Sequence, residues 1–485
     1  MKLLFRLNKN DSSLQSTQIE QLELDKLFKK INRTNTHFGT QYLYYLITQL
    51  RDTLRIENET EYIRKVDRVK KLLSGFNRHR HLTFIGFLVG EKKPFSIVKN
   101  LNIKLYCTLA LINFFCFFLI YFTPSALIPF ILLSFLNSTI YYSKKLSFFY
   151  VRDTVLTAND IYRLLQKLNK ENIKIPSFKS FKNDSRLIRY LYAEVNPFLN
   201  EMAVIFFLIE AIKSIFLLDL FFANLLFNRI EKHKRQLLEL YYLIAKIDTY
   251  ISVYELKEEL NGQICKPNYV KSDNCFIRAN QLFNPLIKEC RPINFKLENS
   301  SMVITGHNAS GKSSLIKTIV TNYIIGKTLG FCFSKDFTTS FESVYFLIGS
   351  SDHTSKGQSL YQYEIKKLEE IVNNTEGSSK KNLIVFDEII RGTNEADREK
   401  ITFSISKYLS QLKNNSIIIT THNISLAKRL VSENLKSYYF KTSFDKITGL
   451  VTFEYELKQG LEETTNAKEL LKNYQFPASV IENIN

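Results

Sequence analysis

Apolar residues follow three different patterns along this chain of 485 residues. Residues 105–142 form one continuous run without a charged side chain. Residues 237–256 place apolar side chains at the spacing of a long amphipathic helix. Short apolar runs at 302–305, 383–386 and 416–420 each end in polar residues, which predicts buried parallel strands. The pattern therefore predicts a helical N-terminal part and an α/β C-terminal part.

The uncharged run at 105–142 is 38 residues long. One membrane-spanning helix needs about 20 residues, so this run is long enough for two. Pro124 supplies a break between them, because proline cannot continue the helical hydrogen bonds. Lys104 precedes the run and Lys144 and Lys145 follow it, which places both ends on the cytoplasmic side. We interpret the run as a transmembrane helical hairpin, and a buried helical pair in a soluble core is the alternative.

A second apolar stretch, residues 202–227, contains Glu210, Lys213 and Asp219. Each charge would be costly at the middle of a bilayer. We therefore predict a buried helix of a soluble domain here.

The chain carries 66 basic and 47 acidic side chains, a formal net charge of +19. Residues 1–104 hold 20 of the basic and 10 of the acidic side chains, so the excess is greatest there. Such a surface attracts nucleic-acid phosphates or anionic lipid head groups, or is only a solvated helix face. The six cysteines contain no CxxC pair, which argues against a zinc site and a disulfide scaffold and favours a reducing, cytosolic setting.

A phosphate-binding pattern follows the first short strand: Gly306, four residues, then Gly311, Lys312 and Ser313. Its glycines let backbone N–H groups converge on phosphates at a helix N-terminus. Lys312 would neutralise the β- and γ-phosphates, and the Ser313 hydroxyl would ligate Mg²⁺. We assign ATP binding to Gly306, Asn308, Gly311, Lys312, Ser313 and Ser314.

Two acidic residues and a histidine end the other two strands. Asp387 suits binding of Mg²⁺, together with Ser313, and Glu388 suits polarisation of the attacking water. His422 could sense the γ-phosphate from the same edge of the sheet. The alternatives are a solvated strand end for the two acids and a structural histidine. The predicted catalytic residues are thus Lys312, Glu388 and His422.

The motifs TGHNASGKS (305–313), DEIIRGT (387–393) and TTH (420–422) together resemble the ATPase domain of the MutS family of mismatch-repair proteins. Residues 348–359, IGSSDHTSKGQS, resemble a loop that in this family reaches across a dimer to the partner's γ-phosphate, as the signature of ABC-type ATPases does. The resemblance implies a composite ATP site completed in trans by Ser355, Gly357 and Ser359.

The resemblance extends upstream more weakly. Residues 27–47 are similar to the start of the family's helical core, and 237–256 to its lever helix. No mismatch-reading or connector domain fits before residue 24, and the predicted hairpin stands where the family inserts a DNA-gripping clamp. Ser310 and Ile390 replace glycines often seen in the family's motifs. These features suggest a short, membrane-associated MutS-like branch.

The sequence thus predicts an all-α core and lever region interrupted by a transmembrane hairpin, followed by an α/β P-loop ATPase domain of ABC type. The expected divisions are 1–104, 105–142, 143–264 and 265–485. We expect a homodimeric Mg²⁺-dependent ATPase at the cytoplasmic membrane, with the ATPase domain in the cytoplasm and lipids around 105–142, that acts on mismatched or branched DNA. The main alternative is an ABC-type ATPase with a membrane or protein partner and no DNA role. An ABC transporter subunit, an SMC-like ATPase and a protein that binds ATP without turnover are less consistent with the motifs.

Overall fold

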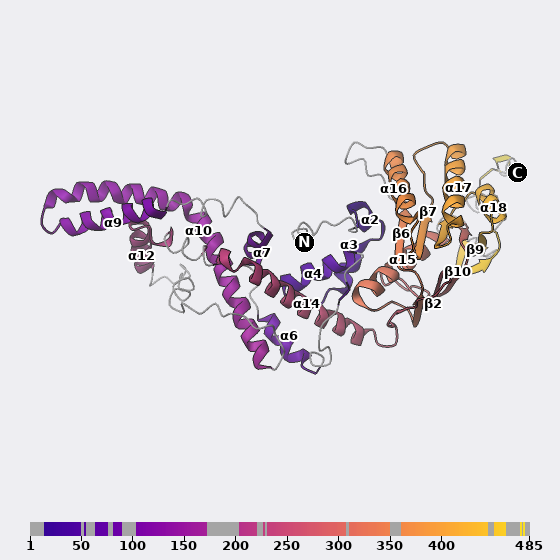
Figure 1. The fold of residues 1–485 in the computed structure, drawn as a ribbon, viewed down its shortest axis with the longest axis horizontal. Helices are drawn as coiled ribbons and strands as arrows, with labels where there is room; N and C mark the ends of the chain where they lie inside the picture. Colours follow the sequence, from indigo (N-terminus) through magenta and orange to yellow (C-terminus); the bar gives the residue numbers. More distant parts are fainter. Residues whose placement is uncertain are drawn as a thin grey trace. The chain divides into compact units, whose positions relative to one another are not determined.

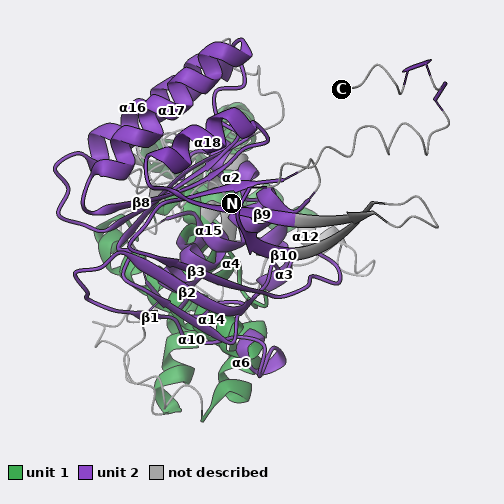
Figure 2. Ribbon diagram, turned by 90° about the vertical axis from the view of Figure 1, so that its right-hand side faces the viewer, with its two compact units in different colours: residues 1–10, 32–45, 55–255 green, residues 11–31, 46–54, 256–485 purple. Residues whose placement is uncertain are grey.

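The chain divides into two compact units, which Figure 2 colours separately. One comprises residues 1–10, 32–45 and 55–255, and the other comprises 11–31, 46–54 and 256–485. Residues 11–31 and 46–54 therefore group with the C-terminal unit, whereas the sequence placed them with the rest of 1–104. The computed structural model describes residues 14–49, 53–54, 64–75, 81–89, 103–171, 203–220, 227, 230–306, 310–349, 360–444, 451–461, 476–477 and 479–480.

The secondary-structure elements described in the first unit are helices. The helices are α4 (His37–Thr48, whose last turn belongs to the second unit), α6 (Val66–Ser74), α7 (His81–Val89), α9 (Ile103–Leu119), η1 (Pro124–Ala126), α10 (Leu127–Lys170), α12 (Ala203–Ile215) and α14 (Lys234–Glu259, whose last residues belong to the second unit). The long helix predicted at 237–256 lies within α14. Its side chain Tyr241 packs edge-on against Phe38 of α4, with ring centroids 4.6 Å apart.

Asp248 of α14 fixes the start of α4. Its buried carboxylate accepts hydrogen bonds from the backbone N–H groups of Asn35 and Thr36, at 2.9 and 2.7 Å, and from the Thr36 hydroxyl at 2.6 Å. A Cβ atom on Gly39 would lie 2.3 Å from the same carboxylate. The NTHFG sequence at 35–39 thus has a structural reason: it supplies donors and leaves room for one buried charge.

The hairpin predicted at 105–142 is present as two helices with a break. α9 ends at Leu119, and α10 follows the short turn η1 that begins at Pro124. α10 then continues without interruption to Lys170, across the division expected after residue 142. Among the described residues, the helix Pro124–Lys145 is long and apolar enough to cross a membrane, and the apolar helix Leu105–Leu119 is shorter. Membrane insertion itself stays a prediction.

The prediction that the apolar side chains of 202–227 are buried is wrong for α12 (Ala203–Ile215). α12 exposes its apolar side chains, including Phe207 and Ile212, and buries Glu210 and Lys213; Asp219, just after it, is buried too. The sequence argument treated each charge as isolated, whereas in the fold the charges face one another and the hairpin. This arrangement inverts the usual distribution of polar and apolar residues.

The second unit contains two sheets. A four-stranded sheet has the order β1-β5-β2-β3, and a six-stranded sheet has the order β10-β9-β4-β8-β7-β6, parallel except for the β9–β10 pair. The strands are β1 (Asn268–Tyr269), β2 (Phe276–Leu282), β3 (Ile293–Glu298), β4 (Met302–Thr305), β5 (Asp336–Thr339), β6 (Ser343–Ile348), β7 (Asn382–Asp387), β8 (Asn415–Thr420), β9 (Lys436–Phe444) and β10 (Val451–Gln459). The three strands predicted from sequence are confirmed as β4, β7 and β8.

Helices cover both faces of the six-stranded sheet, as a parallel sheet requires. The helices of this unit are α2 (Ser16–Gln21), α3 (Leu24–Ile31), α15 (Lys312–Leu329), α16 (Leu360–Thr375), α17 (Glu395–Gln411) and α18 (Ile424–Ser432). Leu368, Leu409 and Leu430 of α16, α17 and α18 share one core with Ile384 and Ile417 of the strands. α15 contacts β6 and β7 from the other side (Figures 1 and 2). The carboxyl ends of β4, β7 and β8 meet at one edge, which positions the candidate site.

Candidate nucleotide-binding site

The loop after β4 has the backbone conformation that its glycines allow. Gly306 has a φ of 141° and Gly311 a φ of 105°, and side-chain-bearing residues rarely adopt either. α15 begins directly afterwards at Lys312. The predicted strand–loop–helix arrangement is therefore present, with the N-terminus of a long helix directed at the loop. Asn308 lies outside the described residues.

Buried polar groups line this loop. The Lys312 ammonium group is buried and donates to the carbonyl oxygen of Gly306 at 2.5 Å. The Ser310 hydroxyl is buried and has no hydrogen-bond partner among the described residues, and a Cβ atom on Gly306 would lie 3.0 Å from it. A polar ligand would stabilise both the buried hydroxyl and the buried ammonium group. The loop therefore fits an anionic group such as a phosphate chain.

The adjacent strand ends present the predicted acids. Asp387 is buried at the end of β7 and accepts a hydrogen bond from the Thr420 hydroxyl at the end of β8. The backbone N–H of Glu388 donates to the Thr420 carbonyl oxygen at 3.3 Å. Thr420 thus fixes the orientation of one carboxylate and the position of the next residue. Asp387, at the end of β7, and Ser313, in the first turn of α15, have the oxygen chemistry that Mg²⁺ prefers.

Basic side chains contact Glu388. Its carboxylate lies 3.2 Å from Nδ1 of His422 and 3.4 Å from the Arg391 guanidinium. Partial burial raises the pKa of Glu388, but the hydrogen bond with His422 and the charges of His422, Arg391 and Lys312 outweigh it and hold the pKa below its usual value. The carboxylate is therefore ionised at neutral pH. The Glu388 backbone has a φ of 47°, a left-handed conformation that stores strain at this position.

A cavity of about 480 Å³ joins the loop to Glu388. Lys312, Ser313 and Ser314 line one wall, and residues 282–293, between and beside β2 and β3, line the other. This volume is in the range of small-molecule sites. The sequence analysis missed the second wall, which includes Phe283, Ile287, Arg291 and Ile293. The only sequence signal is an apolar and basic segment, LFNPLIKECRPI, shortly before the phosphate loop.

The predicted residues are thus partly gathered in the described structure. Gly306, Gly311, Lys312, Ser313, Ser314, Asp387, Glu388 and His422 all lie at the carboxyl edge of the β4, β8 and β7 strands or at the N-terminus of α15. The proposed trans loop, Ser355, Gly357 and Ser359, lies outside the described residues, directly before α16. Arg391, which carries one of the contacts to Glu388, had no role in the sequence analysis, although it lies within the DEIIRGT motif.

Comparison with known proteins also indicates a P-loop ATPase domain. Residues 302–485 match the family model of MutS domain V, a P-loop ATPase domain. The chain is 28% identical over 258 residues to the DNA mismatch repair protein MSH3 of Vanderwaltozyma polyspora and equally to that of Candida glabrata. It is 25% identical over 271 residues to the DNA mismatch repair protein MutS of Alkaliphilus oremlandii.

The extent of these matches is uneven. They cover 50%, 50% and 53% of this chain, but 25%, 25% and 29% of the three relatives. The similarity therefore spans roughly a quarter of the length of the curated proteins. Residues 302–485 of this chain thus match MutS domain V, and about half of the chain is similar to proteins named DNA mismatch repair protein MSH3 or MutS.

Proposed function

We propose that this chain binds and hydrolyses ATP. The observation that carries the proposal is the convergence of a phosphate loop, a buried lysine and two strand-end carboxylates at one edge of a parallel sheet. Lys312 and the glycine loop face a cavity that also contains Glu388. The MutS domain V match and the relatives named above support the same activity.

Each group then has a distinct role in turnover. Backbone N–H groups of the loop and the Lys312 ammonium group bind the phosphates and neutralise their charge. Glu388, held ionised by its neighbours, orients a water molecule in line with the γ-phosphate and accepts its hydrogen bond. His422 supports Glu388 through their 3.2 Å contact. A magnesium ion, held by Ser313 and Asp387, would supply charge neutralisation between the β- and γ-phosphates when bound.

We further propose a homodimer in which Ser355, Gly357 and Ser359 of one chain complete the site of its partner, as the family resemblance implies. We also propose that the chain acts on mismatched or branched DNA, because the curated relatives are named DNA mismatch repair proteins. The excess of basic residues in 1–104 supports this assignment.

The hairpin of α9 and α10 is proposed as a membrane anchor at 105–142, at the cytoplasmic membrane, with the ATPase domain on the cytoplasmic side. The apolar helix Pro124–Lys145 and the lysines flanking the hairpin support this proposal. The same feature favours a second candidate function, an ABC-type ATPase that acts on a membrane or protein partner without a DNA role.

One experiment tests the activity and separates the two candidates. Phosphate release by the detergent-solubilised full chain is measured alone and with homoduplex, mismatched and branched DNA, and Lys312→Ala is measured beside it. We expect turnover that Lys312→Ala abolishes and that mismatched or branched DNA changes. Turnover insensitive to every DNA favours the candidate without a DNA role, and turnover equal in the Lys312→Ala chain contradicts the ATP site itself.

A further inference from the structure

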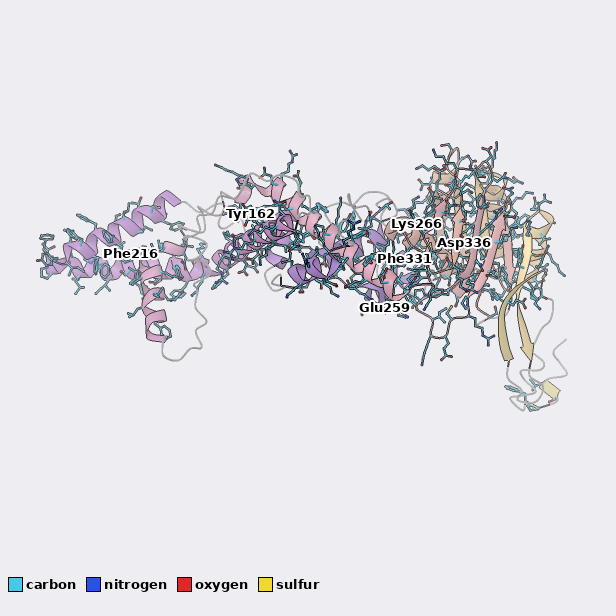
Figure 3. The ribbon with its side chains drawn as sticks, turned by 90° about the horizontal axis from the view of Figure 1, so that it is seen from below. Tyr162, Phe216, Glu259, Lys266, Phe331 and Asp336 are labelled. Carbon is cyan, nitrogen blue, oxygen red and sulfur yellow. The ribbon has the colours of Figure 1, made fainter. Side chains whose placement is uncertain are left out.

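α12 and the hairpin bury polar and charged side chains between them and expose apolar side chains on their outer faces. Asn113 of α9, Asn137 of α10, and Glu210, Lys213 and Asp219 in or just after α12 are all buried. All belong to the same compact unit. In a water-soluble protein such a group of helices would bury its apolar residues instead. Figure 3 labels Phe216, just after α12, which packs on Phe114 of the hairpin with ring centroids 6.1 Å apart.

The buried charges are paired with one another and with α10. Lys145 contacts the Glu210 carboxylate at 2.8 Å, and Lys213 lies 3.8 Å from both Glu210 and Asp219. The Tyr141 hydroxyl donates to Asp219 at 2.6 Å. Two carboxylates and two ammonium groups therefore form one compensated cluster. Charges that are paired in this way are tolerated away from water, so they do not argue against a membrane location as isolated charges would.

The end of α12 is also satisfied by the hairpin. The carbonyl oxygen of Ile215, the last residue of α12, accepts hydrogen bonds from the side-chain amides of Asn137 at 2.8 Å and Asn113 at 3.2 Å. A helix that ends inside hydrocarbon needs such partners, because no water is present to bind its last carbonyls. Asn137 lies ten residues into α10, or about 15 Å along its axis, which is half of a hydrocarbon core about 30 Å thick.

The outer surface of the three helices is apolar on several sides. On α12, Phe207 is 71% exposed, and Leu208, Ile209 and Ile212 are also exposed. On α10, Phe135 is 76% exposed. Exposed apolar side chains also occur along both hairpin helices, at Leu111, Phe114, Phe115, Phe117, Phe118, Ile128, Ile131 and Leu132. A single protein partner covers one side of such a group, whereas lipid surrounds it.

We propose that α12 is a third membrane-embedded helix, which ends near the middle of the bilayer, and that lipid acyl chains cover its Phe207–Ile212 face. The proposal rests on the membrane anchoring proposed for the hairpin and extends it. α12 has 13 residues, about 20 Å, so it enters the hydrocarbon without crossing it. The buried ion cluster and the two asparagines hold it against the hairpin. The membrane unit is thus a packed bundle with a polar interior.

The absence of tryptophan from the sequence makes a direct test available. Single tryptophans are introduced into the full chain as Phe207→Trp on α12, Phe135→Trp on α10 and Tyr408→Trp on α17 of the ATPase domain. Each protein is reconstituted into phosphatidylcholine vesicles in which a rising share of the lipid carries bromine on its acyl chains. Bromine quenches tryptophan emission only at short range. ATP binding is measured for each variant to establish that it is folded.

The three reporters separate the possible outcomes. We expect emission from both Phe207→Trp and Phe135→Trp to fall with bromine content, and emission from Tyr408→Trp to stay unchanged. Quenching of Phe135→Trp without quenching of Phe207→Trp overturns the proposal for α12 and leaves the membrane hairpin intact. Quenching of neither reporter contradicts the hairpin as well. Ile212→Trp on the same face of α12 is the second reporter if Phe207→Trp fails to bind ATP.

Discussion

Replacing Glu388 by glutamine separates nucleotide binding from turnover at this site. The substitution keeps the size and shape of the side chain and removes its charge. Glu388→Gln can no longer act as an ionised acceptor for water, whereas Lys312 and the glycine loop are unchanged. We therefore expect ATP to bind and its hydrolysis to fail.

The structure sets the relative size of the two effects. The partners of Glu388 are partly exposed: the Arg391 side chain is 35% and the His422 side chain 46% accessible. Ion pairs with such exposure contribute about 0–1 kcal/mol each, so folding and binding change little. Loss of a general base costs about 10²- to 10⁴-fold in rate. At about 1.4 kcal/mol for each factor of ten, that is about 3–5 kcal/mol on the chemical step. The effect on kcat should therefore exceed the effect on nucleotide Kd.

Glu399→Gln is the matched control. Glu399 pairs with Arg429 at 2.9 Å, and its side chain is 19% accessible against 18% for Glu388, but it does not line the phosphate cavity. Phosphate release and equilibrium binding of a fluorescent ATP analogue are measured for the parent and both variants. We expect parental kcat for Glu399→Gln and a fall of at least about 10²-fold for Glu388→Gln.

Two results would refute this reasoning. Turnover by Glu388→Gln close to the parental rate would remove Glu388 from the water-activating role. Equal losses in both variants would show that the loss of an ion pair, and not the position of the carboxylate, decides the rate. The pH profile gives a further check: because the pKa of Glu388 is held below its ordinary value of 4.5, the parental rate should not fall through the neutral range on account of this group.

Three further predictions address the surroundings of the site and the helical unit. Thr420→Val, which removes the hydroxyl that orients the strand-end carboxylate, should raise the Mg²⁺ concentration needed for half-maximal turnover about 10- to 100-fold; an unchanged Mg²⁺ titration would contradict this orienting role. Ser359→Ala and Lys312→Ala should each be inactive alone but regain turnover when mixed, and no recovery at any ratio would argue for a site within one chain. Gly39→Ala should destabilise the protein by about 1–3 kcal/mol or more, since its Cβ would lie 2.3 Å from a buried carboxylate oxygen, whereas Gly75→Ala, with its nearest atom at 3.7 Å, should be neutral or slightly stabilising in thermal unfolding.

The nucleotide-binding edge could be predicted from sequence because its signals are local. Each strand is a short, fully buried run, and the functional residues lie at its end or in the segment that follows it. Parallel strands bring their carboxyl ends together, so Lys312, Asp387 and His422 could be placed at one edge without coordinates. The signal for the helix break, Pro124 itself, is local too, and the predicted break is confirmed.

The errors and omissions concern contacts between distant parts of the chain. The charges in and just after α12 were treated as isolated because two of their partners, Tyr141 and Lys145, lie more than 60 residues earlier in the sequence. The wall of the nucleotide cavity formed by residues 282–293 has no motif, since any apolar segment could occupy it. Arg391 lies inside a recognised motif, but only the folded loop places its guanidinium beside Glu388.

Ile390 shows how the fold tolerates a departure from the family's motif. The resemblance suggested that an isoleucine in place of glycine could disturb the loop after Glu388. The residue does adopt a left-handed conformation, with a φ of 63°, which costs a side-chain-bearing residue about 1–2 kcal/mol. Its side chain is also fully buried in the core beneath α16, α17 and α18, and burial of an isoleucine contributes about 1.5–3 kcal/mol. The two effects are of similar size and opposite sign. The loop therefore keeps the glycine-like backbone that positions Glu388, and core packing offsets the strain that glycine would have avoided.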